Sequence, residues 1–269
     1  MTANLTQALL WAALGCGFTW LMTTAGSAVV FFFNTSRKLM HHIFLGFAAG
    51  VMVAASVWSL LNPAIEQAEA QNIPGWIPAA GGFLLGVVFL IALDTFLPHL
   101  HAGEDNPEGI SSNWKRTTLL VSAVTLHNIP EGMSVGLLFA MAAQTAGAAG
   151  DTYLGLAIAL AMGIGLQNFP EGAAISLPLT REGMSKKRAF VLGSLSGIVE
   201  PIFGIAVVLI SGWITPFMPW LLAFAAGAMI YVVVEELIPE AHLGEHSNIG
   251  TLGFIVGFVI MMVLDVALG

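Results

Sequence analysis

Runs of apolar residues, each about as long as a membrane-spanning helix, follow one another along almost the whole chain. A hydrocarbon core about 30 Å thick is crossed by about 20 apolar residues in an α-helix. The sequence therefore predicts an all-α integral membrane protein with eight transmembrane helices, in a single transmembrane domain of residues 1–269. The expected spans are residues 9–33, 43–61, 76–98, 117–142, 153–179, 189–211, 217–240 and 249–268.

Composition excludes the soluble classes. Only 9% of the residues are charged and 57% are hydrophobic, whereas soluble domains have about 25% charged residues. The formal net charge of −8 gives no electrostatic footprint for nucleic acid. The single cysteine, Cys16, excludes an internal disulfide and a zinc site built from cysteines. We expect the lipid bilayer as a partner and no nucleic acid.

The basic residues all fall in the first, third and fifth connections between the expected spans. They are Arg37, Lys38, Lys115, Arg116, Arg181, Lys186, Lys187 and Arg188. Because basic residues are retained on the cytoplasmic side, these connections are predicted to be cytoplasmic. With eight spans, both termini are then predicted to be extracytoplasmic.

Spans 1 to 3 resemble spans 6 to 8. Residues 47–50 and Met52 recur as 224–227 and Met229, and Phe83, Gly86 and Asp94 recur as Phe254, Gly257 and Asp265. A shift of five spans reverses direction across the bilayer, so this pattern predicts inverted repeats in a 3+2+3 arrangement. Secondary transporters built this way bind substrate near midplane at the repeat interface. Chance similarity between Gly/Ala-rich helices, and helix packing at small residues, are the alternatives.

Spans 4 and 5 share a six-residue motif. Residues 127–132 are His-Asn-Ile-Pro-Glu-Gly, and residues 167–172 are Gln-Asn-Phe-Pro-Glu-Gly. The first, second and fifth positions are spaced i, i+3 and i+4, so their polar side chains share one helix face. The proline is expected to kink each helix. The candidate ligands are His127, Asn128, Glu131, Gln167, Asn168, Glu171 and, in span 6, Glu200.

The three glutamates among these candidates need compensation inside a membrane. A lone carboxylate at the bilayer centre costs about 2.5–3.5 kcal/mol on insertion scales. Imidazole, amide and carboxylate together suit a divalent metal, and two ions could share Glu131 and Glu171 as bridges. A proton path, a histidine that only packs, and a structural Asn-x-Pro motif are the alternatives.

The sequence resembles the ZIP family of divalent metal transporters, most closely its GufA-like bacterial branch. The resemblance is carried by these two motifs and by residues 97–99, 200–201 and 235–240. The resemblance covers essentially the full chain, and the span 4 motif matches the family pattern fully. Span 5 carries Gln167 where many members have histidine, and Asn168 where related members often have an acid.

The resemblance implies a two-metal centre. One ion would be surrounded by His127, Glu131, Gln167, Glu171 and a methionine of span 2, here Met52. The other would be surrounded by Asn128, Glu131, Asn168, Glu171 and Glu200. Core packing is the alternative role for Met52, because thioethers commonly fill gaps.

A possible exit path for the ion lies toward the expected cytoplasmic face. Its members are Glu235, Glu236, Glu240, His99 and His101. A solvated loop at 99–108 and a helix end at Glu240 are the alternatives. Asp94 and Asp265 occupy matching repeat positions and are expected to be structural.

The function we expect is uptake of divalent metal cations into the cytoplasm by alternating access. Zinc is favoured by family frequency, with cadmium, iron, manganese and cobalt as further cargo. The metal is substrate, and neither a cofactor nor enzyme activity is expected. The resemblance also implies a homodimer in the bacterial inner membrane, with spans 1, 4, 5 and 6 moving against spans 2, 3, 7 and 8.

Two other classes use similar residues. A proton-coupled carrier of a small organic cation could use the same buried acids without metal. An intramembrane metalloprotease would need a His-Glu-x-x-His pair, and the expected spans contain only one histidine, His127.

Overall fold

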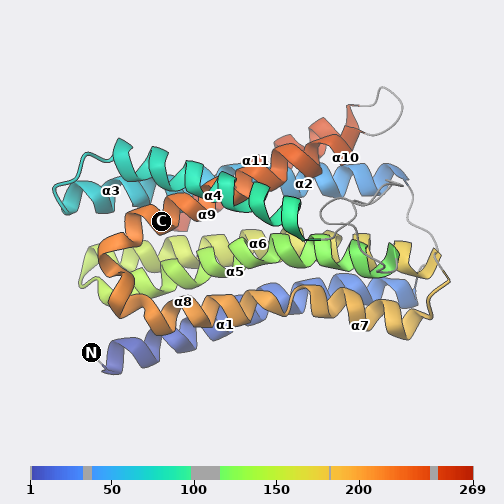
Figure 1. The fold of residues 1–269 in the computed structure, drawn as a ribbon, viewed down its shortest axis with the longest axis horizontal. Coiled ribbons are helices and arrows are strands. Elements are labelled where there is room, and N and C mark those ends of the chain that lie inside the picture. Colours follow the sequence, from blue (N-terminus) through green and yellow to red (C-terminus); the bar gives the residue numbers. More distant parts are fainter. Residues whose placement is uncertain (1, 33–37, 98–115, 182, 243–247, 269) are drawn as a thin grey trace.

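The computed structural model describes residues 2–32, 38–97, 116–181, 183–242 and 248–268, which form helices joined by turns (Figure 1). The α-helices are α1 Thr2–Ser27, α2 Lys38–Ala55, α3 Asn62–Ala70, α4 Trp76–Phe96, α5 Arg116–Gln144, α6 Ala148–Arg181, α7 Lys186–Ser196, α8 Val199–Ile214, α9 Met218–Val232, α10 Ile238–His242 and α11 Ile249–Leu268. Short 3-10 segments cover Ala28–Phe31 and Thr215–Phe217, and π-helical segments cover Ser56–Leu61 and Val233–Leu237.

The part of the chain that the structure describes contains six helical stretches long and apolar enough to cross a membrane. They are Asn4–Phe31, His42–Ala70, Trp76–Phe96, Ala148–Thr180, Lys186–Ala241 and Ile249–Leu268. The chain is thus an all-helical, multi-pass membrane protein.

The difference between six stretches and the eight expected spans has two sources. The stretch Lys186–Ala241 has 56 residues, more than twice what one crossing needs, and Figure 1 shows the chain reversing between α8 and α9. Helix α5 has 29 residues, about 40 Å of helix, but its polar motif lowers its hydropathy. The count of eight crossings stays a prediction.

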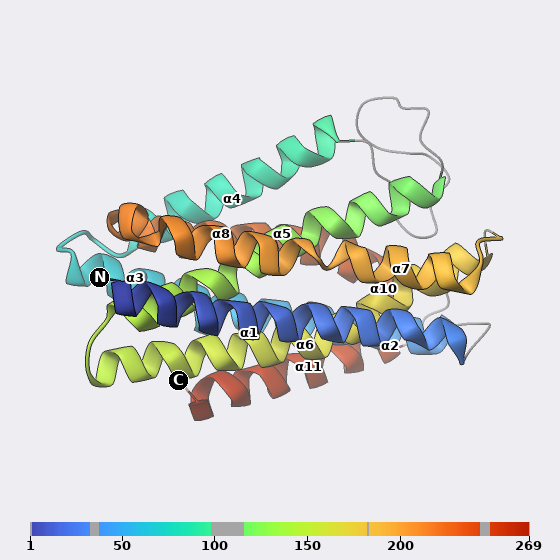
Figure 2. The same ribbon diagram turned by 90° about the horizontal axis from the view of Figure 1, so that it is seen from below.

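The helices pack in two groups, seen as layers in Figure 1. Helices α1, α5, α6, α7 and α8 form one group, which we call the α5 bundle. Helices α2, α3, α4, α9, α10 and α11 form the other, the α2 bundle. In Figure 2, turned by 90°, most of the long helices of both bundles again run along the same axis, and α4 is tilted away from it.

Two helix pairs of the α2 bundle approach so closely that glycine is required. Each pair brings together two Phe-x-x-Gly segments: 47–50 of α2 with 254–257 of α11, and 83–86 of α4 with 224–227 of α9. A Cβ on any of these glycines would overlap the carbonyl oxygen of the facing phenylalanine. The α2–α11 and α4–α9 pairs therefore pack in the same way at these segments.

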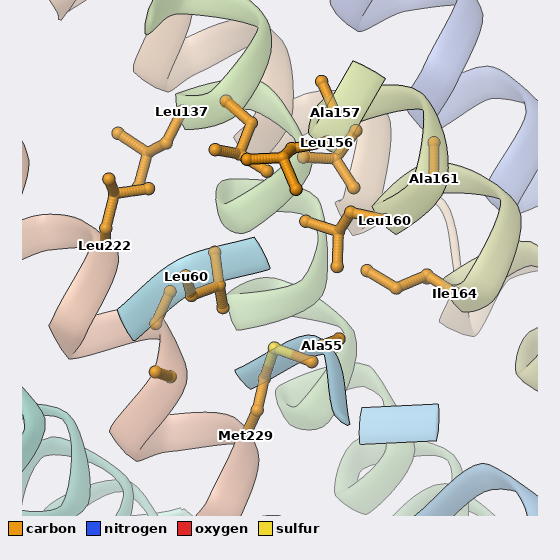
Figure 3. Close-up of a cluster of buried hydrophobic side chains, with 14 of the residues drawn as sticks. Ala55, Leu60, Leu137, Leu156, Ala157, Leu160, Ala161, Ile164, Leu222 and Met229 are labelled. Carbon is orange, nitrogen blue, oxygen red and sulfur yellow. The ribbon is translucent and has the colours of Figure 1, made fainter. Parts of the chain in front are cut away.

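A large apolar core joins the two bundles. Figure 3 shows Leu60 and Met229 of the α2 bundle packed beside Leu137, Leu160 and Ile164 of the α5 bundle. Along α5 and α6 these residues lie between the two polar motifs and the end of the molecule that carries both termini (Figure 1). Apolar packing thus separates the motifs from that end.

The two ends of the molecule differ in charge. Both termini lie at one end, together with α3 and the start of α6 (Figure 1), which carry the exposed acids Glu66 and Asp151, respectively. Helix α7 begins at the opposite end with the exposed Lys186, Lys187 and Arg188. An even number of crossings would give this arrangement of the termini.

Candidate metal centre

The two six-residue motifs lie in the middle of α5 and α6, and both helices continue through Pro130 and Pro170. Most of the predicted ligands are deeply buried. His127, Asn128, Glu131, Gln167, Asn168 and Glu200 are each 7% exposed or less, and Glu171 is half-buried. The helical spacing thus places the polar face of both motifs inside the protein.

Amide side chains of α6 bind carboxylates of two neighbouring helices. Gln167 Nε2 donates to Glu131 Oε1 of α5 at 2.7 Å. Asn168 Nδ2 donates to Glu200 Oε2 of α8 at 2.9 Å. The structure therefore brings the predicted residues of α5, α6 and α8 together.

Several oxygen atoms of this site are buried without a hydrogen-bond partner within the described residues. They are Glu131 Oε2, Glu171 Oε1, Gln167 Oε1, Asn128 Oδ1 and Asn168 Oδ1. A buried polar group left unsatisfied costs about 1–3 kcal/mol. A cation satisfies acceptors of this kind, and carboxylate, carbonyl and imidazole donors suit divalent ions.

The carboxylates of the site also act on one another. Glu131, Glu171 and Glu200 are close enough to repel each other when ionised. Buried charges in proteins are normally paired or bound to metal. A bound dication would remove the repulsion and satisfy the free oxygens together.

The centre is not a cluster of ionisable ligands alone. Within the described ranges, no three His, Cys, Asp or Glu side chains gather into a group that could hold a metal ion. Amides stand between the acids, as the Gln167 to Glu131 and Asn168 to Glu200 hydrogen bonds show. The side-chain oxygens of Gln167 and Asn168, which have no hydrogen-bond partner among the described residues, thus lie beside the acids.

His127 contacts an acid of the expected exit path. Its Nε2 lies 2.5 Å from Glu236 Oε1, and Glu236 belongs to the π-helical segment Val233–Leu237. Of the other exit-path candidates, Glu235 is exposed and Glu240 is half-buried. His99 and His101 lie outside the described residues. Among the described residues of the exit path, Glu236 thus contacts the centre directly, through His127.

Met52 is 2% exposed and belongs to the large apolar core of the protein. Its backbone carbonyl accepts a hydrogen bond from Ser56 Oγ at 2.7 Å. This environment fits the packing role that the sequence left open, and the ligand role of Met52 stays a prediction.

Sequence reasoning missed the contribution of α1. Thr19 and Thr23 are fully buried; Thr23 Oγ1 lies 3.5 Å from Glu200 Oε1, and Thr19 O accepts from Asn168 Nδ2 at 3.4 Å. The signal was present as hydroxyl residues at positions 19, 23 and 27, spaced i, i+4 and i+8 in a largely apolar helix.

Comparison with known proteins shows which proteins this chain is similar to. The family described as "ZIP Zinc transporter" matches residues 104–265. The chain is 38% identical to zinc transporter ZIP11 of Homo sapiens, over 96% of this chain and 97% of that protein. It is 40% identical to zinc transporter GufA of Myxococcus xanthus, over 84% and 86%. It is 38% identical to zinc transporter ZIPB of Bordetella bronchiseptica, over 96% and 82%.

Proposed function

Because the chain belongs to the ZIP zinc transporter family, we propose that it carries zinc across the bacterial inner membrane into the cytoplasm through the centre between α5, α6 and α8. The family consists of transporters and not of enzymes. One observation carries the proposal: in both motifs, carboxylate and amide oxygens are buried with no hydrogen-bond donor among the described residues. Cadmium, iron, manganese and cobalt are further cargo of the same chemistry.

We propose two ion positions in this centre. The first is held by His127, Glu131, Gln167, Glu171 and Met52, and the second by Asn128, Glu131, Asn168, Glu171 and Glu200. The side-chain oxygens of Gln167 and Asn168 support these assignments. Each amide donates a hydrogen bond from its nitrogen to a carboxylate, and its oxygen has no hydrogen-bond partner among the described residues. Glu131 and Glu171 would bridge the two ions.

The transporter is proposed to be a single domain of eight crossings, arranged 3+2+3 with inverted repeats. The paired Phe-x-x-Gly contacts support the repeat, because 47–50 and 224–227 are matching positions and so are 83–86 and 254–257. The π-helical segments Ser56–Leu61 and Val233–Leu237 follow the matching segments in α2 and α9. The end of the molecule that carries the basic residues of α7 is assigned to the cytoplasm, and both termini are assigned to the opposite side.

Transport by alternating access is proposed to move the α5 bundle against the α2 bundle. Among the described residues, two side-chain polar contacts join the bundles: Gln67 Nε2 with Tyr153 Oη at 3.2 Å, and His127 with Glu236. The rest of that interface is largely the apolar core of Figure 3. Apolar surfaces slide with few hydrogen bonds to break.

The ion is proposed to leave toward Glu236, which already contacts His127, and then toward Glu235, Glu240, His99 and His101. A homodimer is the proposed assembly in the membrane. Apolar side chains exposed along α4, such as Leu84, Leu85 and Val88, would face lipid or a second copy.

Metal content of the purified protein tests the proposed cargo. The full chain is equilibrated with zinc in detergent, desalted and analysed, beside Glu131→Gln and Glu171→Gln variants. We expect up to two zinc ions per chain and a loss of zinc in both variants. A parent chain that retains no zinc, manganese or iron contradicts the proposal and favours the proton-coupled carrier of an organic cation.

A further inference from the structure

The carboxylate of Glu200 is held on both oxygens by other helices. Oε2 accepts from Asn168 Nδ2 of α6 at 2.9 Å. Oε1 faces Thr23 Oγ1 of α1 at 3.5 Å. Both side chains and Glu200 itself are fully buried. Unlike Glu131 and Glu171, Glu200 therefore has a neighbouring donor for each oxygen.

The backbone near Thr23 is shaped to allow this contact. A Cβ on Gly197, just before α8, would lie 2.9 Å from Glu200 Oε1 and 3.0 Å from Thr23 Oγ1. Any larger residue at position 197 would thus press on both groups. The Thr23 hydroxyl also lies 3.4 Å from Thr19 O, so its single proton is shared between a carbonyl and the carboxylate.

Helix α1 also orients Asn168. Asn168 Nδ2 donates to Glu200 Oε2 and to Thr19 O. Asn168 Oδ1 has no hydrogen-bond partner among the described residues. Since the two ends of an amide point in opposite directions, fixing the nitrogen fixes the oxygen as well. The same α1 turn therefore controls the direction of two proposed ligands of the second ion.

We propose that Thr23, supported by Thr19, is a positioning residue for the second metal ion and sets the affinity of that position for a divalent cation. This inference rests on the proposed function. Each carboxylate oxygen has two lone pairs, so Glu200 can keep its protein donors and still bind an ion. Groups that hydrogen-bond metal ligands hold them in the binding orientation, and their loss typically lowers metal affinity 10- to 100-fold.

The test is a zinc titration of the full-length purified protein in detergent, by calorimetry, for the parent and three variants. Thr23→Val keeps the shape and removes the hydroxyl, whereas Thr23→Ser keeps the hydroxyl. Thr24→Val is the matched control, because Thr24 Oγ1 lies 2.7 Å from Ser194 Oγ at the α1–α7 contact and not at the centre. Thermal unfolding of each variant is measured in parallel.

We expect Thr23→Val to weaken the second zinc about 10- to 100-fold and to leave the first unchanged. Thr23→Ser and Thr24→Val should bind two ions like the parent. Equal titrations of Thr23→Val and the parent overturn the inference, and so does a loss in Thr24→Val as large as that in Thr23→Val. A parent that binds no zinc overturns the proposed function and this inference together, whereas two ions bound equally by all variants overturn only the inference.

Discussion

His127 of α5 and Glu236 of the Val233–Leu237 segment are in direct contact, with Nε2 2.5 Å from Oε1. The two residues belong to different bundles, and the sequence placed them in different parts of the pathway. A carboxylate on one nitrogen of a histidine fixes the ring and leaves the other nitrogen for a metal. This contact thus links the centre to the proposed direction of release.

The first prediction concerns this link. We expect Glu236→Gln to lower zinc transport about 10- to 100-fold, because the histidine loses a charged partner next to the ion. Glu66→Gln is the control, since Glu66 is an exposed acid of α3 outside the proposed pathway. Initial rates of zinc uptake into proteoliposomes measure both. Equal rates for the two variants would argue against a role for the contact.

The second prediction concerns close helix packing. Gly50→Ala would place a Cβ against Phe254 O of α11, and overpacking of this kind costs about 1–3 kcal/mol. Gly17→Ala is the matched control, because a Cβ at Gly17 would contact no atom within 4 Å. Thermal unfolding in detergent should show a lower midpoint for Gly50→Ala and an unchanged or higher one for Gly17→Ala. The reverse order is incompatible with the α2–α11 contact.

The third prediction concerns a buried hydrogen bond in the α2 bundle. Ser59 Oγ donates to Asp265 Oδ1 at 2.5 Å, and both residues are buried. Ser59→Ala leaves the carboxylate without this donor and should cost about 0.5–2 kcal/mol of unfolding free energy. In a double-mutant cycle with Asp265→Ala, the two losses should not add. Strict additivity would show that the pair does not interact.

The fourth prediction concerns orientation. The parent cysteine, Cys16, is fully buried, so it gives a low labelling background. A thiol at the exposed position of Lys187 (Lys187→Cys) should react with a membrane-impermeant maleimide only in permeabilised cells. Asp151→Cys, exposed at the opposite end, should react in intact cells. The opposite result places the basic end outside and reverses the proposed direction of release.

The positions of the site residues on α5 and α6 were predictable because helical periodicity is local. Residues 127, 128 and 131 share a face whatever packs against it, and the same holds for 167, 168 and 171. Their burial follows because a polar face in a membrane avoids lipid. The Phe-x-x-Gly segments were predictable as a repeat because the same residues recur at matching positions in the sequence.

Contacts between distant helices were not predictable in this way. Neither the His127 to Glu236 contact nor the Thr23 to Glu200 contact follows from periodicity, because each depends on which helix faces lie opposite one another. The hydroxyl positions of α1 resembled ordinary helix packing, since threonine hydroxyls in helices commonly bond to their own backbone, as Thr19 Oγ1 does to Cys16 O. Only the fold shows that Thr23 lies beside an acid.

The most direct test of the central claim is zinc flux into proteoliposomes by the parent and by Glu131→Gln and Glu171→Gln. Each substitution keeps the shape of the side chain and removes a charge that the proposed ions need. Glu66→Gln, at an exposed acid of α3, is the control. We expect both site variants to lose at least about tenfold in initial rate and the control to transport like the parent. Folded Glu131→Gln and Glu171→Gln proteins that both transport zinc at the parent rate would contradict the account.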